Sequence, residues 1–544
     1  ARIDRLTAPA KRTVNAAAVI GSRFTTELLT VALEEGDDSG QAALAELVHS
    51  ELIDQVMFTP QAEYAFRHSL VQTVAYESQL KPARAQLHRR LAAAIQRHSA
   101  ALDENAALIA GHLEAAGDLH EAFGWHMRAG AWFTNRDISA ARTSWKRAQQ
   151  LADQLPANEP NKRTMQVAPR ALVCGSTWRV GGSVTDTGFE ELRELCTGPD
   201  TQVPLVIGMA GLLMELALHA RVREAAQRAS EYIDLLDSIN NPTLTVGALY
   251  PAIYAKCEVG EMADVLHLAQ RVIDLAGGDP TKGNFLTGSP LAFATAMRAS
   301  ARCALGQRYW KEDFDQALQV SRVDPTTYVS IVMFKYVLGI PFGALLPDTA
   351  AMEDTAHALQ TAQRCSEDFA LHAARLARGI TLISADSANA TSAFDLLAEA
   401  RAAALKERFI LTLVPIIDLQ TAAEKARTDD LDGAIELSRH IIAEQFRSGA
   451  TLYLGCATGV LVDSLLRRGR ATDTDEAQAA IDTLAAVPTD PGFVLYELPL
   501  LRMRALLARA RDDDRGYRAF IDRYFAMAEA HEFEGHLATA RAMR

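Results

Sequence analysis

The fold is decided by residues 117–148, which read GDLHEAFGWHMRAGAWFTNRDISAARTSWKRA. In the second half of this stretch Ala141 is followed by Trp145 four positions later and by Ala148 seven positions later, with Trp132 upstream. Residues at this spacing lie on one face of a helix, and small residues there let paired helices approach closely. The stretch therefore predicts helical hairpins.

The same spacing occurs in the first half of the stretch, where Ala122, His126 and Ala129 follow Gly117. Both matches resemble the tetratricopeptide register, with His in the aromatic position of the first. They begin 19 residues apart rather than the usual 34 or so, which means that neighbouring hairpins share a helix or that one match is accidental. Weaker echoes of the register occur at Gly260, Val265, Ala269 and Val272, and at Asp429, Ala434, Ser438 and Ile441.

From about residue 105 to the end, the pattern contains helices broken by short Gly, Asp, Asn or Pro turns and essentially no strand signal. We predict an all-α solenoid of degenerate tetratricopeptide-like hairpins. Its first part is expected over residues 101–350 and its second over 351–544, with a further soft boundary near residue 160.

The first hundred residues differ from the rest. Helical spacing is expected at 14–20, 24–33 and 42–52, followed by two short strands at 53–58 and 64–66. The intervening Thr59-Pro60-Gln61-Ala62 suits a hairpin turn with Pro60 in it. Helical spacing returns at 68–79 and 84–97. Residues 1–100 thus predict a winged-helix-like module with a short β-hairpin.

Composition limits the function. The net charge of −13 argues against a protein whose main work is holding nucleic acid. Six scattered cysteines without C-x-x-C spacing indicate neither a zinc ribbon nor a disulfide framework. We see no apolar run that approaches a membrane span and no signal peptide, so a cytoplasmic protein is expected. The chain begins without Met, and we expect an upstream portion.

No catalytic residue or metal site is predicted. The loop 277–283 has glycines and a lysine but not the G-x-x-x-x-G-K-[ST] spacing of a phosphate cradle. The pairs His120 with His126 and His531 with His536 lack the i, i+4 spacing that a shared zinc ion needs. The run 512–514 is interpreted as a solvated turn.

A basic stretch follows the predicted hairpin and comprises Lys81, Arg84, His88, Arg89, Arg90 and Arg97. A winged helix that binds DNA would place such residues near the phosphate backbone. The overall negative charge favours a solvated or domain-facing helix instead. Lys81, Arg84, Arg89 and Arg90 are the basic-helix candidates.

Residues 64–78, YAFRHSLVQTVAYES, with LHRRL at 87–91 and KRTVNAAAVIG at 11–21, resemble a recurring signature. It is similar to the region that follows the nucleotide-binding domain in STAND-type signalling ATPases, especially bacterial ones linked to adenylate or guanylate cyclase domains and tetratricopeptide arrays. The similarity covers about the first 155 residues. Beyond them only the character of a helical array agrees, with a looser likeness near residues 527–531.

In related switch proteins a winged-helix His points at bound ADP, and the resemblance places that role on His68, with Arg67 beside it as a second nucleotide-sensor candidate. Ser69 stands where many such proteins have Asp, which puts any acid-dependent part of the contact in doubt. The alternative is that His68 only caps or braces the hairpin. The resemblance implies no cofactor in this chain, since ATP or ADP would bind mainly to an upstream domain.

The sequence thus predicts the regulatory sensor and scaffold segment of a cyclase-linked ATPase, with no catalysis of its own. The array would bind a protein partner or a small effector, and the module would contact an upstream nucleotide-binding domain. The alternative is a transcription regulator that binds DNA through the winged helix while the array senses an effector. No contact with a membrane is expected.

Overall fold

The computed structural model describes residues 3–33, 37–58, 62–99, 101–181, 184–285, 288–322, 324–365, 367–385 and 390–544. These residues form two compact units, unit 1 over residues 1–170 and unit 2 over residues 171–544. Both units are built from packed helices, and the strands that the structure describes all lie in unit 1. The chain is therefore an all-α array with one small sheet near its start, as the sequence predicts.

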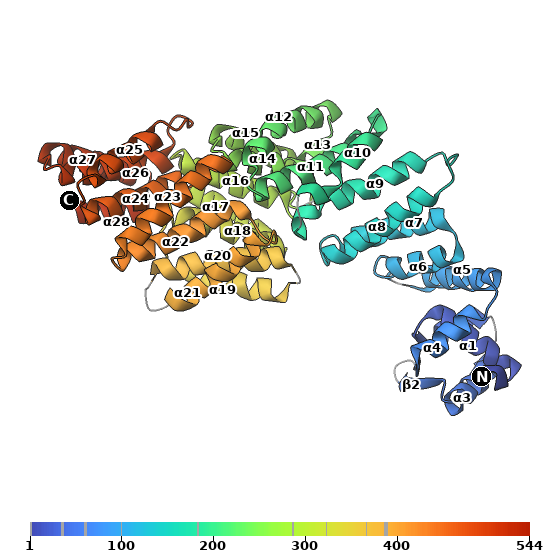
Figure 1. Ribbon diagram of the computed structural model, residues 1–544. Coiled ribbons are helices and arrows are strands. Elements are labelled where there is room, and N and C mark those ends of the chain that lie inside the picture. Colours follow the sequence, from blue (N-terminus) through green and yellow to red (C-terminus); the bar gives the residue numbers. More distant parts are fainter. Residues whose placement is uncertain are drawn as a thin grey trace. The chain divides into compact units, whose positions relative to one another are not determined.

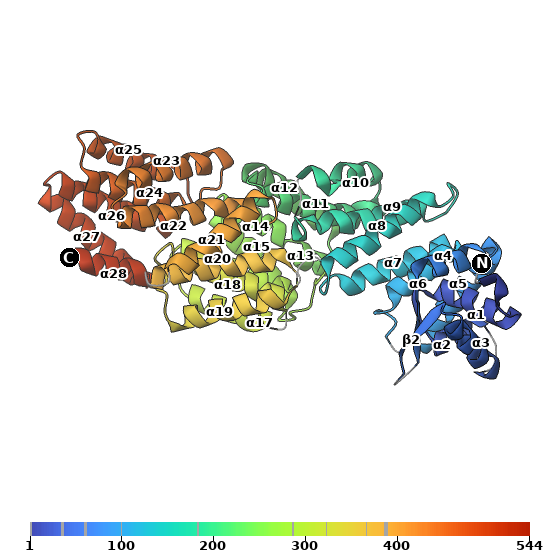
Figure 2. The same ribbon diagram turned by 60° about the horizontal axis from the view of Figure 1, so that its bottom comes forward.

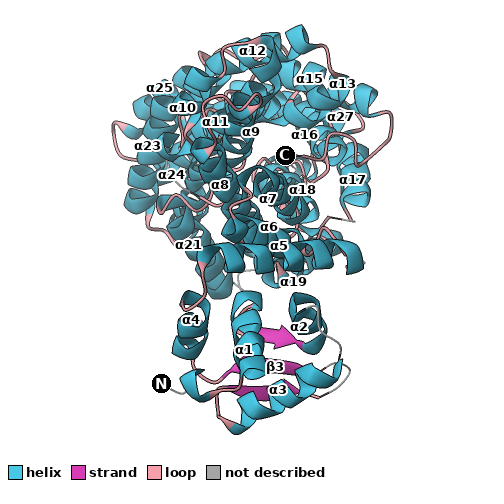
Figure 3. Ribbon diagram, turned by 90° about the vertical axis from the view of Figure 1, so that its right-hand side faces the viewer, coloured by secondary structure: helices cyan, strands magenta, loops and turns pink. Residues whose placement is uncertain are grey.

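Unit 1 begins with a module in which helices and strands alternate. Its elements are α1 (Ala8–Ile20), β1 (Arg23–Thr25), α2 (Thr26–Leu33), α3 (Asp37–His49), β2 (Ile53–Met57), β3 (Glu63–Phe66), α4 (Ser69–Glu77) and α5 (Lys81–His98). Figure 3 shows the strands beside α1, α2 and α3. The predicted turn at residues 59–61 lies outside the described residues.

The sheet has three antiparallel strands in the order β1-β3-β2, where the sequence predicted two. Residues 24 and 25 were expected to open a helix, but Phe24 pairs with Tyr64 in the sheet and the helix begins at Thr26. Phe24 is buried, and its ring stacks on Tyr64 with centroids 5.9 Å apart. Burial of one aromatic side chain against β3 outweighs the weak local helix preference of this stretch.

The rest of unit 1 is helical and consists of α6 (Ala106–Ala116), α7 (Leu119–Phe133), α8 (Ile138–Gln154) and most of α9 (Lys162–Gly175). The small residues of both register matches, Ala122, Ala129, Ala141 and Ala148, are fully buried. Helix α7 packs against both α6 and α8. Neighbouring hairpins therefore share α7, which explains the short spacing between the two matches.

Unit 2 continues the array, and its helices lie side by side in chain order (Figures 1 and 2). They are α10 (Phe189–Leu195), α11 (Gln202–Leu218), α12 (Val222–Ile239), α13 (Pro242–Ala248), α14 (Tyr250–Glu258), α15 (Met262–Ala276), α16 (Pro290–Ala304), α17 (Trp310–Ser321), α18 (Pro325–Gly339), α19 (Thr349–Arg364), α20 (Asp368–Ala385), α21 (Ala390–Leu405), α22 (Val414–Arg427), α23 (Leu431–Ser448), α24 (Leu454–Arg468), α25 (Asp473–Ala485), α26 (Val494–Ala510), α27 (Asp514–Ala530) and α28 (Glu534–Met543).

Several turns between helices share one design. A residue with positive φ, such as Asp429 at 68°, precedes an acidic N-cap. Asp430 accepts a hydrogen bond from the Gly433 amide at 3.0 Å, and Asp513 accepts one from Gly516 at 2.9 Å. A side-chain acceptor at this position satisfies a free amide of the first helical turn. The acidic run at 512–514, predicted as a solvated turn, thus also caps α27.

Unit 2 is also joined by polar contacts between residues 188 to 227 positions apart in the chain. We call this set the seam, and its members include Arg179–Glu367, Arg223–Phe446, Ala263–Asp490, Gly306–His531, Lys311–Glu534 and Leu346–Glu534. The similar separations mean that each contact joins two parts of the chain that lie one superhelical turn apart. Successive turns of the solenoid therefore touch along this line.

Helix α11 corrects one expectation from the sequence. With the three residues before it, it forms an apolar segment, Pro199–Leu218, of 20 residues, long enough to cross a membrane by length and composition alone. Within the protein 72% of the apolar window is buried, and α11 packs against α12 and α14. This is the pattern of a core helix, in which apolar residues surround the whole circumference.

Candidate functional site

His68 occupies the N-cap of α4, directly after β3. Its backbone is extended (φ −137°, ψ 133°), and its side chain makes no capping hydrogen bond to the helix. The residue is exposed. Two apolar side chains on the same helix, Leu70 and Val74, are also exposed, at 70% and 49%. His68 thus lies at a helix start beside an uncovered apolar face of unit 1.

Arg67 is used within the module. Its guanidinium pairs with Asp54 on β2 at 2.8 Å and with Glu51 at 3.4 Å. Hydrogen bonding to Arg67 lowers the pKa of Asp54. Arg67 therefore fastens the end of β3 to β2 and the turn before it.

Two of the four basic-helix candidates on α5 contact neighbouring helices. Arg84 lies over the Tyr76 ring, 4.5 Å from its centroid, and donates to the Tyr76 carbonyl at 3.2 Å. Arg89 forms a bidentate pair with Asp118, at 2.7 and 2.8 Å. Lys81 is exposed at the start of the helix, and Arg90 is half-buried. Arg84 and Arg89 thus join α5 to α4 and to the turn after α6.

His88, counted among the basic residues from the sequence, is a buried neutral residue. Its Nδ1 lies 2.9 Å from His112 Nδ1, and its Nε2 lies 3.0 Å from the Tyr76 hydroxyl. Burial, with the neighbouring His112 second, lowers the pKa of His88 to about 4. The chain Tyr76–His88–His112 links α4, α5 and α6. Its one signal in the sequence is that His112 follows the apolar Ile109 by three positions, on what is a buried helix face.

The histidines considered for zinc have separate partners. His126 pairs with Glu114 at 3.3 Å, whereas His531 donates to the Gly306 carbonyl at 2.7 Å. His536 Nδ1 lies 2.7 Å from the Tyr524 hydroxyl. Among the described residues no three His, Cys, Asp or Glu side chains come close enough together to hold a metal ion.

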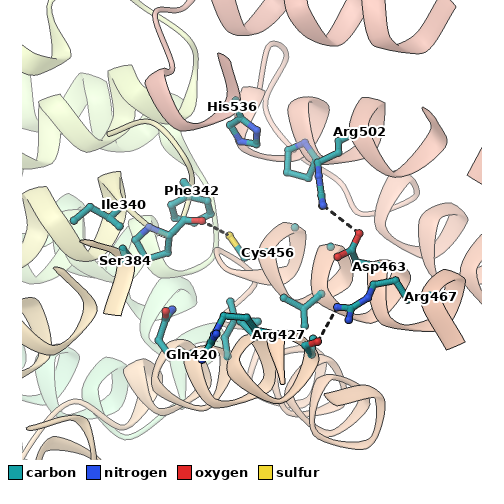
Figure 4. A pocket seen from close by; sticks show the side chains of 18 residues that line it. Ile340, Phe342, Ser384, Gln420, Arg427, Cys456, Asp463, Arg467, Arg502 and His536 are labelled. Atoms are coloured by element: carbon teal, nitrogen blue, oxygen red, sulfur yellow. Dashed lines mark hydrogen bonds and ion pairs between the residues drawn. The ribbon is translucent and has the colours of Figure 1, made fainter. Parts of the chain in front are cut away.

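A cavity of about 540 Å³ opens in the second half of unit 2 (Figure 4). Its walls come from α20, α22, α24, α26 and α28 and from the residues after α18. Apolar side chains line one part, among them Phe342, Leu419, Val460 and Pro499. No local sequence pattern marks this lining, because its residues come from six separate segments.

Charged side chains line the other part of the cavity. Arg427, Arg467 and Arg502 come from three successive layers of the array, and Asp463 lies one turn before Arg467 on α24. Arg502 donates to Asp463 at 3.2 Å, and Arg467 donates to the Ala426 carbonyl at 2.7 Å. Among the described lining residues, three arginines therefore face one carboxylate.

His536 borders the cavity without adding charge. Burial, with the nearby Arg502 as a second cause, lowers its pKa to about 4. The imidazole is neutral at physiological pH, so the positive charge of the lining comes from the arginines. The arrangement is suited to binding a ligand, because it offers apolar surface, guanidinium donors and one carboxylate.

No family model matches the chain. It is 32% identical over 171 residues to an uncharacterized protein of Rhizobium meliloti (strain 1021), a match that covers 30% of this chain and 16% of that protein. The matched part is thus a small fraction of that relative's length.

Two solved structures were compared. A signal transduction ATPase with numerous domains and a tetratricopeptide repeat sensor, from Pyrococcus horikoshii, aligns with a TM-score of 0.39 at 9% identity, over 98% of this chain and 64% of that one. Yeast Tom70 aligns with a TM-score of 0.29 at 10% identity, over 86% of this chain and 93% of that one. TM-scores this low support no conclusion about the fold, which is assigned from the helix packing described above.

Proposed function

We propose that the chain is the regulatory sensor and scaffold segment of a multidomain, cyclase-linked signalling ATPase of the cytoplasm. In this proposal the array binds a partner or small effector, and residues 1–100 form a winged helix that relays the nucleotide state of an upstream domain. The chain itself performs no catalytic step. ATP or ADP is bound mainly by the upstream domain.

One observation carries the proposal: His68 is exposed at the start of a helix whose neighbouring face is apolar and uncovered. A His at a helix N-terminus can donate to a phosphate oxygen, and the helix dipole favours the same anion. The exposed Leu70 and Val74 offer a surface that a second domain would bury. The order helix, strand, helix, helix, strand, strand in α1 to β3 supports the assignment to a winged helix.

The proposed mechanism is a shift between two dockings of the module on the upstream domain. A ligand of the array favours one docking only by binding that state more tightly. By linkage, nucleotide exchange then changes the affinity of the array for its ligand by the same factor. The chain Tyr76–His88–His112 and the Arg89–Asp118 pair supply rigid links from α4 and α5 to the first helices of the array.

The test replaces His68 by alanine in the protein as encoded, after the coding region upstream of Ala1 has been translated and searched for G-x-x-x-x-G-K-[ST]. Loss of one hydrogen bond to a charged group is worth roughly 1.5–3 kcal/mol, so ADP release should accelerate by about ten- to a hundredfold. Release is followed with a fluorescent ADP analogue. His440→Ala, an exposed His on α23, is the control and should release ADP at the wild-type rate.

Equal release rates for the wild type and His68→Ala would remove the sensor role. If the upstream region lacked a nucleotide-binding loop, the assignment to a signalling ATPase would be wrong. DNA binding would then become the favoured function. That alternative requires retention on heparin with a steep salt dependence. The use of Arg84 and Arg89 in contacts within unit 1 argues against it.

A further inference from the structure

We propose that the 540 Å³ cavity between α22, α24 and α26 binds a small amphipathic organic anion, with an apolar body and one carboxylate or phosphate group. This inference rests on the part of the proposed function that gives the array a ligand, and it names the site and the chemistry of that ligand. It does not depend on the module or on His68.

The size of the cavity favours a small molecule over a protein segment. Pockets for small ligands measure about 300–1,000 Å³ and combine mostly apolar walls with a few polar groups. The cavity falls in this range, and its polar groups gather on α24 and α26 and at the end of α22. Figure 4 shows the labelled side chains around one shared space.

The charge of the lining selects an anion. Three arginines and one carboxylate, Asp463, line the cavity in a chain whose net charge is −13. Arg427 and Arg467 also pair with Glu424 and Asp429, but neither carboxylate lines the cavity. A guanidinium has five N–H donors in a planar fork, and the described partner of Arg502 uses one of them. The remaining donors suit carboxylate or phosphate oxygens.

Gly459 supplies an independent observation. It lies in the interior of α24 and lines the cavity, and a Cβ built there meets no atom within 4 Å. One turn earlier, by contrast, a Cβ on Gly455 would come within 2.9 Å of the Leu495 carbonyl, so the contact of α24 with α26 requires that glycine. Glycine within a helix costs roughly 0.5–1 kcal/mol relative to alanine. No packing contact requires glycine at position 459, so a larger side chain there would occupy the open space of the cavity.

The test is a fluorescence titration of the protein with 8-anilinonaphthalene-1-sulfonate, which has an aromatic body and one sulfonate. We expect saturable binding with one molecule per chain. Decanoate or decyl phosphate should compete, and decylammonium should not. Competition by only one of the two anions would tell whether the site takes a carboxylate or a phosphate.

Two variants probe the cavity, and each has a matched control. Gly459→Leu fills the open space and should weaken binding by about tenfold or more, equivalent to roughly 1.4 kcal/mol. Gly124→Leu, at an exposed glycine of α7 that also has no atom within 4 Å, should bind as the wild type does. Arg427→Gln should weaken binding by about fivefold, since the guanidinium is half-exposed and screened. Arg447→Gln breaks an equivalent i, i+3 pair with Glu444 outside the cavity and should have no effect.

Circular dichroism melting shows whether each variant is folded, and Arg427→Gln keeps the test decisive if Gly459→Leu unfolds. Equal probe affinity in the wild type and Arg427→Gln, or competition by decylammonium as strong as by decanoate, would overturn the proposal. So would the absence of any binding by the probe and both anions. If a protein segment bound through these residues while the small anions did not, the small-molecule assignment would be wrong and the sensor function would stand. If wild type and His68→Ala released ADP at the same rate, only the proposed relay through residues 1–100 would be wrong.

Discussion

Replacing Glu258 by glutamine should stabilise unit 2 at alkaline pH. Glu258 ends α14 and is 6% exposed among apolar and aromatic neighbours that include Met333, Phe334 and Tyr453. Burial raises the pKa of its carboxyl to about 7, even though hydrogen bonding to Tyr254 lowers it. The interior thus favours the protonated acid, and ionisation in the folded state costs free energy.

The direction and size of the effect follow from this pKa. An ordinary glutamate has a pKa of 4.5, so the unfolded chain loses the proton near that pH while the folded protein keeps it to about pH 7. The free energy of unfolding therefore falls as pH rises from 4.5 to 7 and is constant above that range. The shift corresponds to roughly 3 kcal/mol at about 1.4 kcal/mol per pKa unit. Glutamine is neutral throughout and escapes this loss.

The assay is thermal melting by circular dichroism at half-unit steps from pH 5 to pH 8. If unit 2 melts cooperatively, its unfolding entropy of about 2 cal/mol/K per residue converts roughly 3 kcal/mol into a difference in Tm of about 4 °C. The difference between Glu258→Gln and the wild type should grow from about 1 °C at pH 5 to this value at pH 8. Glu436→Gln, on the exposed side of α23, should follow the wild type. A difference that is constant over the whole range would refute the reasoning.

Two further predictions concern packing in unit 2. Asp313 is buried and accepts hydrogen bonds from Arg298 at 2.7 and 3.0 Å and from Arg302 at 2.6 Å, so Asp313→Ala leaves two partly buried cations and should cost roughly 3–5 kcal/mol. Chemical denaturation of the two proteins measures this loss, and a cost below 1 kcal/mol would contradict it. Gly455→Ala and Gly459→Ala should have opposite effects: the first forces α24 from α26 and costs about 1–3 kcal/mol, and the second gains about 0.5–1 kcal/mol. Melting curves of the two variants measure these effects. A loss of stability in both variants would contradict the open space beside Gly459.

Much of the helical array could be predicted from the sequence, because hairpin packing depends on short-range spacing. Ala122, Ala129, Ala141 and Ala148 are buried where the register places them. In the two weaker matches to the register, Val265 on α15 and Ser438 on α23 are also fully buried. Trp132 departs from the pattern, for it is half-exposed and carries the Arg136 guanidinium 3.6 Å from its ring centroid. The alanines of the register are buried because only small residues fit where two helices touch, and the large Trp145 is buried beside them.

Strand β1 could not be predicted, because three residues are too few to show a period of two. Phe24 would serve equally well in an amphipathic helix, and its pairing with Tyr64 is formed across about 40 residues of chain. The buried state of His88 was missed for a related reason. Its neighbours Arg89 and Arg90 made the segment look like a charged surface, whereas burial, with His112 of the next helix beside it, lowers the pKa of His88 and removes its charge.

The cavity was beyond sequence reasoning because it depends on how the layers of the array stack. Arg427, Arg467 and Arg502 come at unequal positions along α22, α24 and α26, so no fixed repeat period brings them together. The seam contacts pose the same difficulty at longer range, since a separation of 188 to 227 residues reflects the superhelical pitch and not any local pattern. Both features follow from small rotations between hairpins, which accumulate along a solenoid.

The cavity and the seam meet at the same two segments of unit 2. Phe342 and His536 line the cavity. Glu534, two residues before His536, accepts a hydrogen bond from Lys311 at 2.5 Å. It accepts another, at 3.2 Å, from the amide of Leu346, which follows Phe342 by four residues. Both bonds belong to the seam, so a ligand that shifts α28 acts on contacts between superhelical turns. A ligand transmits a signal only through contacts that differ between two states. Segments far apart in the chain also pack through aromatic side chains, since the Trp310 ring lies 6.1 Å from that of Phe533 and the Phe342 ring stacks on Tyr453 at 5.1 Å. A ligand in the cavity, which Phe342 lines, would therefore act on the solenoid through this packing as well as through the seam.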